Sequence, residues 1–359
     1  MKVYETVKLG ASEPIFCDYT QSQKLSVKVE LEINVLPLKG RKMLEIKPFH
    51  NEYVEEAAKI FTMNYKILCE EYNELSPNFE NKEIIKPMLR DIIKENPSVV
   101  ALSKNKVVGY LTGYSKIPKL RGSTSGVYIP EWAHSSVTNE KEGIYSSLYK
   151  FLAKKWVYNG CYTHILTFFA NDTILKELFY RLCFGLLVID GLRPIKRLNV
   201  KEINDITIRE VTEKDLPTLQ GIEEKLIAHL NDSPIFLNRA VQENTIEEFL
   251  DDDVKTLVVE KDKKLRSCMR GTLNKSDGCD ILQTQGTLGI NFAYTDPKDR
   301  GLGLATILLD ELIKWGSLKD MHRCTVDCEA QNLEGTYFWM KYFNPVCYSI
   351  IRKIDDRIR

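Results

Sequence analysis

A glycine-rich run that begins with an arginine is the part of this sequence best suited to hold a phosphate group. The run Arg-Gly-Leu-Gly-Leu-Ala at 300–305 lies between an apolar strand predicted at 290–295 and an amphipathic helix predicted from about Leu304. The N-terminus of a helix presents unpaired N–H groups and the positive end of the helix dipole, and both attract anions. Gly301 and Gly303 remove Cβ atoms that would keep a pyrophosphate away, and Arg300 adds a cation. The run therefore predicts a pyrophosphate site.

Asp327 and Glu329 supply a second group of reactive side chains. They are two residues apart in the apolar strand TVDCEA, so both point to one face of a sheet. A buried carboxylate is unfavourable unless it is paired or functional. Glu329 is our preferred general base or amine-binding residue, and an ion pair with a neighbouring Arg or Lys accounts for it equally well. Asn291, in the strand before the glycine run, could orient a water molecule.

The elements that would position these groups occur twice along the chain, in one order. Each copy has a short strand, two helices, a β-hairpin, a third strand, an amphipathic helix ending near a tryptophan, a buried strand, a helix led by Asn and rich in aromatic residues, and a last strand. This order predicts an α/β fold with a mixed sheet. The boundaries that we predict are a strand extension at 1–40, a first domain at 41–200 and a second domain at 201–359. Within the extension, apolar residues alternate from Leu25 to Val35 and predict a half-buried strand.

The glycine run and its surroundings resemble the GNAT superfamily of acyl-CoA-dependent N-acyltransferases. The family motif Q/R-x-x-G-x-G/A matches Arg300, Gly303 and Ala305, with Thr295 in register before it and Asn332 after it. The resemblance implies an α/β (α+β) fold of two tandem GNAT domains, each with a mixed, mostly antiparallel, twisted sheet flanked by helices. A dinucleotide-binding fingerprint fits less well, because a threonine stands where its third glycine is required.

The resemblance also implies roles for individual residues. The co-substrate is acetyl-coenzyme A (acetyl-CoA), with no metal, and the residues that would bind it are Ala293, Tyr294, Thr295, Arg300, Gly301, Leu302, Gly303, Leu304, Ala305, Thr306 and Asn332. The backbone of the first three would bind the pantetheine arm, the amides of 301–306 would hold the pyrophosphate, and an amide near Thr295 would polarise the thioester carbonyl. A neutral amine would then attack the thioester directly, without a covalent acyl-enzyme.

The acid that protonates the leaving thiolate is not where this family usually keeps it. Counting from Asn332 places Trp339 at the position of the family's tyrosine, and an indole cannot deliver a proton usefully. Tyr337 is the candidate substitute in the same helix, with Tyr342 beside it, although the helical rotation points both elsewhere. Protonation of the thiolate by water is the alternative.

The first copy lacks the residues that favour phosphate in the second. An approximate register sets Glu140 against Arg300 and Tyr145 against Ala305, so an acid would repel a pyrophosphate and a ring would crowd the helix start. Within this resemblance, we expect a degenerate GNAT domain that forms a wall of the acceptor site, lined there by Glu131 and His134.

Composition narrows the classes of protein that the chain can belong to. The 50 basic and 50 acidic residues give no net charge, so no global field attracts nucleic acid. No apolar run reaches the roughly 20 residues needed to cross a bilayer, and no secretory signal follows the first residues, so we expect a cytoplasmic protein. Nine cysteines, an odd count without a C-x-x-C pair, predict reduced and mostly buried thiols, among them Cys161, Cys183, Cys324, Cys328 and Cys347.

The function that these features predict is an N-acetyltransferase that transfers the acetyl group of acetyl-CoA to an amine of a small molecule or a protein. Two alternatives stay open: a tandem GNAT ligase of the mycothiol-synthase type, and a non-catalytic acyl-CoA-binding sensor or scaffold. The sequence names neither the acceptor nor the oligomeric state.

Overall fold

A computed structural model describes residues 44–238 and 253–358. The strand predicted within 25–35 lies outside the described residues, and so does most of the segment 231–254, where the second copy's second helix is predicted.

The first half, 44–200, folds in the predicted order with one elaboration. In place of a single third strand it has three short strands, and the second of them ends at Ile129 because Pro130 has no N–H to donate to a sheet. Its elements are β1 (Glu45–Pro48), α1 (Val54–Glu71), α2 (Lys82–Glu95), β2 (Val99–Ser103), β3 (Lys106–Leu111), β4 (Tyr114–Ile117), β5 (Ser125–Ile129), β6 (His134–Ser136), α3 (Lys141–Tyr158), β7 (Cys161–Phe169), α4 (Thr173–Arg181) and β8 (Gly185–Pro194).

The second half, 201–358, repeats this order. The helix after the glycine run begins at Leu304, as predicted. A short 3-10 helix at Asp280–Leu282 lies in the loop between the strands Lys264–Leu273 and Thr287–Thr295. The elements are β9 (Thr207–Glu210), α5 (Leu216–Asn231), β10 (Val254–Lys261), β11 (Lys264–Leu273), β12 (Thr287–Thr295), α6 (Leu304–Leu318), β13 (Arg323–Glu329), α7 (Leu333–Met340) and β14 (Asn344–Lys353).

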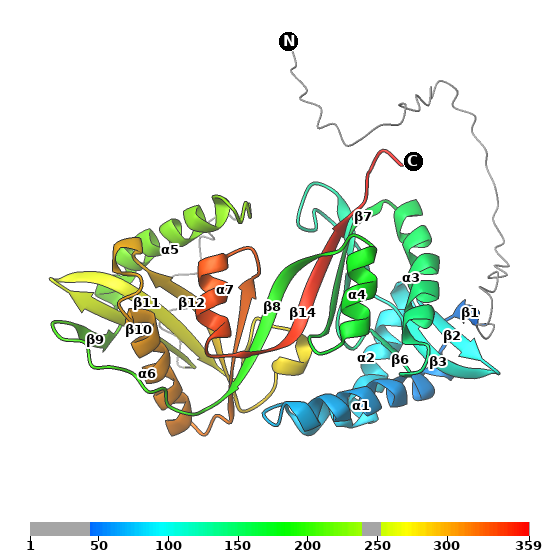
Figure 1. The fold of residues 1–359 in the computed structure, drawn as a ribbon, viewed down its shortest axis with the longest axis horizontal. Coiled ribbons are helices and arrows are strands. Elements are labelled where there is room, and N and C mark those ends of the chain that lie inside the picture. Colours follow the sequence, from blue (N-terminus) through cyan, green and yellow to red (C-terminus); the bar gives the residue numbers. More distant parts are fainter. Residues whose placement is uncertain (1–43, 239–252, 359) are drawn as a thin grey trace, which may run out of the picture. The chain divides into compact units, whose positions relative to one another are not determined.

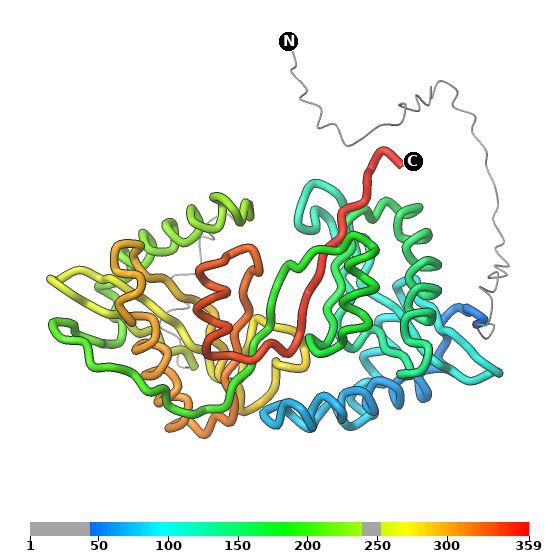
Figure 2. Tube along the Cα trace, viewed as in Figure 1, coloured from blue at the N-terminus to red at the C-terminus, as the bar shows by residue number. Residues whose placement is uncertain are grey.

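The two halves exchange their last strands. The larger sheet has ten strands in the order β4-β5-β7-β14-β8-β13-β12-β11-β10-β9. Strand β8 of the first half pairs with β13 of the second, and β14 of the second half pairs with β7 of the first. Figures 1 and 2 show β8 (green) and β14 (red) lying side by side between the halves, each reaching the partner half's sheet. The described residues of the two halves therefore share one continuous sheet.

The hydrophobic cores follow this exchange. The core around helices α1 and α3 includes apolar residues that the second half contributes, namely Ile281, Leu282, Val346 and Ile350. The core under helix α6 in turn includes Ile189 from β8. Because burial of apolar surface is the main favourable term in folding, each half depends on the other for part of its stability.

Strands β12 and β13 pair over only part of their length. Their parallel ladder runs from Thr287 to Ile290 on β12 and from Arg323 to Val326 on β13. On its other side, β12 has a bulge, because Arg270 pairs with Phe292 while the next residue of β11 pairs with Ile290. Asn291 is the extra residue of this bulge, which re-aims the strand where the ladder with β13 ends.

Candidate active site

A cleft forms where β12 meets the N-terminus of α6, and we call it the loop cleft. Its volume is about 500 Å³. It gathers all but one of the residues predicted to bind acetyl-CoA, the lining ones being Ala293, Tyr294, Thr295, Arg300, Gly301, Gly303, Leu304, Ala305, Thr306 and Asn332. Leu302 does not line it, and this residue is 56% exposed. The structure thus places the glycine run in a concave site.

The glycines of this loop are required by backbone conformation. Gly301 has φ of +79° and Gly303 has φ of +87°, a region that other residues enter only at a cost. A Cβ atom on Gly301 would touch nothing within 4 Å, so the predicted reason, removal of an obstructing Cβ, does not explain this position in the protein alone. Gly303 is also the N-cap of α6, and no side chain caps the helix. The first-turn N–H groups of α6 therefore lack a side-chain partner at the cleft.

The charges of the loop cleft are mostly paired. Arg300 forms an ion pair with Glu334 and donates from Nε to the Thr295 carbonyl over 3.3 Å. Asp299 is 3.4 Å from Nη1 of Arg266. Lys341 is a cation at the end of α7 that the sequence did not single out, and it has no ion pair among the described residues. One cation thus remains for an anionic ligand without breaking an ion pair.

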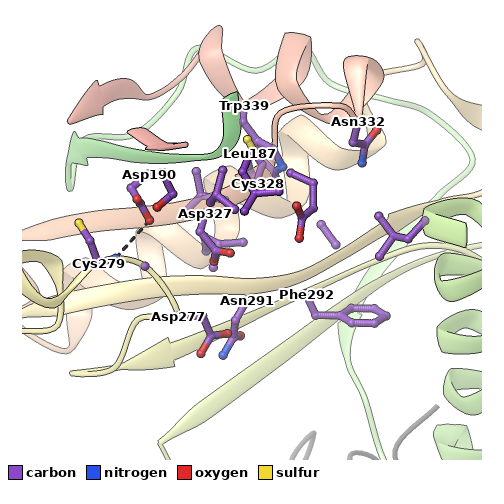
Figure 3. A pocket seen from close by; sticks show the side chains of 18 of the residues that line it. Leu187, Asp190, Asp277, Cys279, Asn291, Phe292, Asp327, Cys328, Asn332 and Trp339 are labelled. Atoms are coloured by element: carbon purple, nitrogen blue, oxygen red, sulfur yellow. Dashed lines mark hydrogen bonds between the residues drawn. The ribbon is translucent and has the colours of Figure 1, made fainter. Parts of the chain in front are cut away.

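A second cavity, which we call the acidic cavity, lies beyond the point where β12 and β13 stop pairing. Its volume is about 570 Å³. The charged side chains among its described lining residues are Arg121, Asp190, Asp277, Asp327 and Glu329. Figure 3 shows Asp190 and Asp327 on the same side of this cavity, with Asn291 below Asp327. Four carboxyl groups and one guanidinium group therefore line the cavity.

Asp190 is the buried acid at the base of this cavity, and sequence reasoning missed it. It lies on β8, directly opposite Asp327 in the antiparallel ladder with β13, so the two side chains share a face. The backbone N–H of Cys279 donates to its Oδ1 over 3.2 Å, and only 2% of the residue is exposed. Burial, reinforced by the charge of Asp327, raises the pKa of Asp190 to about 8.

Glu329 and Asn291 also line the acidic cavity. Nη2 of Arg121, from the loop between β4 and β5, is 2.9 Å from Oε1 of Glu329, whose side chain is 9% exposed. The ion pair that the sequence left open as an alternative for Glu329 is therefore present, and its partner comes from the other half. Asn291 accepts a hydrogen bond from Nε of Arg270 and donates to the Thr272 hydroxyl, which fixes its amide in place.

The aromatic residues considered as proton donors lie on or just after helix α7, and their side chains point in different directions. Tyr337 is 78% exposed and lines neither the loop cleft nor the acidic cavity, because the helix turns it outward. Trp339 is buried and lines both. The hydroxyl of Tyr342 lies 3.0 Å from that of Thr306, at the start of α6, and lines the loop cleft alone. The structure therefore does not bring Tyr337 to the site.

The loop cleft and the acidic cavity meet. They share the lining residues Leu226, Ala293, Asn332 and Trp339. Asn332 is held by its own cap, since its Oδ1 accepts from the Gly335 N–H over 3.1 Å. A ligand in the loop cleft can thus reach a ligand in the acidic cavity past Ala293 and Trp339.

In the first half the corresponding helix start has charged side chains around it, and the predicted register is wrong by three residues. Glu140 is the N-cap of α3 in the left-handed conformation, so it corresponds to Gly303, the N-cap of α6, and not to Arg300. The next residue, Lys141, forms an ion pair of 2.7 Å with Asp172, the N-cap of α4. Both side chains are more than four-fifths buried, so this pair occupies the place between the two helix starts.

Glu131, His134 and Tyr145 lie in the interior and not in an acceptor cleft. Oε1 of Glu131 accepts from the Ile281 N–H over 2.8 Å, and neither Glu131 nor His134 lines the acidic cavity. Nε2 of His134 donates to a backbone carbonyl, so its Nδ1 accepts from the Tyr145 hydroxyl over 2.7 Å. Tyr145 is buried against His134, so the expectation that it crowds the helix start is wrong.

Among the cysteines, Cys183 is exposed after the end of α4, whereas Cys161, Cys324, Cys328 and Cys347 are buried as predicted.

Replacing Glu140 by glycine is expected to raise the free energy of unfolding by about 0.5–1 kcal/mol. The left-handed conformation costs a residue with a Cβ about 1–2 kcal/mol, and this strain is removed. Part of the gain is lost because glycine increases the conformational entropy of the unfolded chain. The side chain is exposed and forms no ion pair among the described residues, so little is lost with it. Urea denaturation measures the change, and Gly303→Ala is the matched reverse substitution, with an expected loss of stability. A decrease for Glu140→Gly would contradict the assigned conformation.

The fold is similar to those of solved acetyltransferase structures. The structure is similar to a GCN5-related N-acetyltransferase from Sphaerobacter thermophilus, with 12% identity over 86% of this chain and 95% of that chain and a TM-score of 0.51. A tandem GNAT protein from the clavulanic acid biosynthesis pathway gives 11% identity over 86% of this chain and 98% of that chain, with a TM-score of 0.46. The predicted fold class, two tandem GNAT domains with mixed, mostly antiparallel sheets flanked by helices, is confirmed.

Part of the second half is similar in sequence to a known family. Residues 224–343 match the model of the acetyltransferase (GNAT) family. No curated protein matches the chain by sequence. Among the described residues, none of the helices has the length and apolar composition of a membrane span.

Proposed function

We propose that the protein transfers the acetyl group of acetyl-CoA to an amine that binds in the acidic cavity. The observation that carries this proposal is the junction of the two sites at Ala293, Asn332 and Trp339. On one side lies a loop with the features of a pyrophosphate site, and on the other lie buried carboxyl groups that suit a cationic amine. The GNAT family match of the second half supports the reaction class.

The residues of the loop cleft fit acetyl-CoA. The start of α6 has no side-chain cap, the two glycines hold the loop open, and Arg300 and Lys341 offer cations to the phosphates. Acetyl-CoA would supply the acetyl group as a thioester. Ala293 lines both sites, so we assign to the β12 backbone near Ala293, and not near Thr295, the polarisation of the carbonyl.

Asp190 is our proposed general base. The acceptor arrives as an ammonium ion, and the Asp190 carboxylate takes one proton from it, which leaves a neutral amine with a free lone pair. The new C–N bond forms as the C–S bond breaks, and the second proton that the nitrogen loses passes to the leaving thiolate. Because Tyr337 is turned outward, we propose that water delivers the proton to the thiolate.

The first half supplies parts of the acceptor site and, we propose, no second cofactor site. Arg121 and Asp190 come from it, so it forms one wall of the acidic cavity. The Lys141–Asp172 ion pair lies where the second half has its loop cleft. We keep the domain boundaries at 40 and 200 as a proposal, with the last strand of each domain placed in the other's sheet.

Replacing Arg300 by glutamate is expected to weaken acetyl-CoA binding at least about tenfold, roughly 1.4 kcal/mol, because an acid would stand beside Glu334 where a phosphate must bind. Isothermal titration with acetyl-CoA measures the affinity. Lys298→Glu is the matched control, since Lys298 undergoes the same charge change in the adjacent turn but is exposed and does not line the loop cleft. Equal affinities for Arg300→Glu and the wild type would refute the assigned phosphate loop.

Turnover separates the proposed enzyme from a non-catalytic acyl-CoA-binding sensor. The absence of a tyrosine at the cleft position occupied by Trp339 is the observation that favours the sensor. Release of CoA in the presence of a panel of primary amines is the expected result for the enzyme. Tight acetyl-CoA binding with no amine-dependent release would instead support the sensor.

A further inference from the structure

Residues 278–282 form a tight turn, which we call the Cys279 turn, and its backbone holds the carboxyl group of Asp190. The Cys279 N–H donates to Oδ1 of Asp190 over 3.2 Å. Gly278 permits this approach, because a Cβ atom at its position would lie 2.9 Å from the same oxygen. The N–H of Leu282 donates to the Cys279 carbonyl over 3.0 Å, which closes the turn into one hydrogen-bonded unit. A shift of the turn would therefore carry the donor away from Asp190.

The Cys279 turn is anchored to the first half at Trp132, which lies in the loop after β5. The indole Nε1 of Trp132 donates to Oδ2 of Asp280 over 2.5 Å. Trp132 is itself fixed, since the residue is buried and its carbonyl accepts from the Tyr110 hydroxyl over 2.8 Å. The side chains of Ile281 and Leu282 are buried in the core of the first half. An unbroken chain of contacts thus runs from this tryptophan to the proposed base.

We propose that Trp132 is a positioning residue for the proposed base: through Asp280 it keeps the Cys279 N–H in place at the carboxyl group of Asp190. This inference rests on the proposed function, in which Asp190 removes a proton from the amine. A hydrogen bond from an N–H favours the ionised carboxylate over the protonated acid, so its loss makes Asp190 harder to ionise. Trp132 then sets the pH range in which the base works, although it lines neither the acidic cavity nor the loop cleft.

The other titratable groups around Asp190 do not replace this N–H. Burial and the charge of Asp327 raise the pKa of Asp190, whereas the hydrogen bond from the Cys279 N–H lowers it. The remaining titratable side chains around it, from β13, β14, the loop between β11 and β12 and the loop after β5, are Cys328, Cys347, Asp277, Cys279 and Glu131. All of these are acids, so none stabilises the carboxylate by a positive charge. The guanidinium of Arg121, in the same cavity, is paired with Glu329.

The experiment follows the titration of Asp190 directly, by the NMR resonance of its carboxyl carbon in the full-length protein containing isotopically labelled aspartate. The spectrum of Asp190→Asn identifies this resonance by its absence. Trp132→Phe removes the indole donor and is expected to raise the midpoint of the titration by about 0.5–1 pH unit, the range expected for weakening a hydrogen bond to a charged group. The pH limb of kcat/KM for a primary amine should move upward by the same amount.

Trp156→Phe is the matched control. Trp156 is also buried in the first half, but its indole nitrogen has no hydrogen-bond partner among the described residues, so the midpoint should keep its wild-type value. Asp280→Ala removes the acceptor from a partly exposed position and should raise the midpoint as Trp132→Phe does. The double variant should shift it no further, because both substitutions break one hydrogen bond. Asp280→Asn retains an acceptor oxygen and should stay close to the wild type.

The outcomes separate this inference from the proposed function. An unchanged Asp190 midpoint in Trp132→Phe and in Asp280→Ala overturns the inference, whether or not the protein acetylates amines. An equal shift in Trp156→Phe overturns it too, since a general loosening of the core would then be the cause. If Trp132→Phe does not fold, Asp280→Ala decides alone. A shifted carboxyl titration in a protein that acetylates no amine supports the chain of contacts while the proposed reaction fails.

Discussion

Asp190→Asn is expected to lower kcat/KM for amine acetylation by about 100-fold or more, because a positioned general base typically contributes this much. Asparagine has nearly the same shape and can keep the hydrogen bond from the Cys279 N–H, so only the proton acceptor is lost. Acetyl-CoA affinity should change little, since Asp190 lines the acidic cavity and not the loop cleft. A steady-state assay with a primary amine acceptor, combined with titration of acetyl-CoA, measures both quantities.

The pH dependence of this variant provides a sharper readout. Burial raises the pKa of Asp190 to about 8, so the wild-type kcat/KM is expected to rise with pH up to about 8 as the base ionises. Asp190→Asn should lose this limb and keep only the rise that the acceptor's own deprotonation produces. An unchanged profile would show that another group is the base.

Glu131→Gln is the matched control for this substitution. Glu131 is equally buried, burial also raises its pKa to about 8, and it lines neither the acidic cavity nor the loop cleft. It should keep the pH limb of the wild type. Both substitutions are expected to change the free energy of unfolding in the same direction. A carboxyl group whose pKa is raised in the folded state stabilises the fold fully below its unfolded pKa, and this contribution is lost as the pH rises through about 8. The neutral variants therefore gain stability relative to the wild type as the pH rises.

Phe179→Ala is expected to lower the stability of both halves together, by about 3–5 kcal/mol, although Phe179 lies in the first half alone. Its ring is fully buried and packs against Tyr145, Tyr149 and Phe184, so its removal leaves a cavity in that core. The loss reaches the second half because β8 and β14 are exchanged and one sheet joins the halves. We therefore expect a single unfolding transition.

Tryptophan fluorescence can follow each half separately. Trp132 and Trp156 lie in the first half, and Trp315 and Trp339 in the second. Replacing one pair by phenylalanine leaves the other as reporter, and in each version the fluorescence midpoint in urea should coincide with the midpoint from circular dichroism and fall after Phe179→Ala. Leu308→Ala, a buried substitution in the second core, is the reciprocal test. If the second-half reporter kept its transition after Phe179→Ala, the halves would be independent.

Much of the fold could be predicted from the sequence because helix and strand periods are local. The glycine run, the start of α6 at Leu304 and the cap at Asn332 could all be placed by their chemistry, and the structure gathers them in one cleft. The strands that close each half, β8 and β14, were also predicted as strands.

The exchange of these strands could not be predicted, because an apolar strand satisfies either sheet equally well. The apolar sequence of β8 predicts that the strand is buried, but it does not predict which strand lies beside it. Asp190 was overlooked as a direct result: it was assigned to the first copy, and only the exchange brings it opposite Asp327. An acidic residue within an otherwise apolar strand was the signal that could have identified Asp190 as a candidate.

The register of the first copy failed for a different reason. Alignment by motif set Glu140 against Arg300, whereas the left-handed cap sets it against Gly303. A positive φ at a glutamate carries no mark in the sequence, since glycine is the residue that usually signals it. Lys341 and Arg121 were missed because single cations on a helix end and a loop have no pattern at all.

The exchanged strands also bear on how this chain could have changed over time. A duplicated domain that has lost its own ligand site is ordinarily free to degenerate further or to be deleted. Here β8 carries Asp190 into the acidic cavity, and β14 leaves the second half to complete the first. Deleting either copy would therefore remove a strand from the remaining one, and it would remove a carboxylate from the site if the first copy were lost. If the first half holds no cofactor, as we propose, the exchanged strands would still retain it, and its sequence could vary widely only where it touches neither the shared sheet nor the cavity.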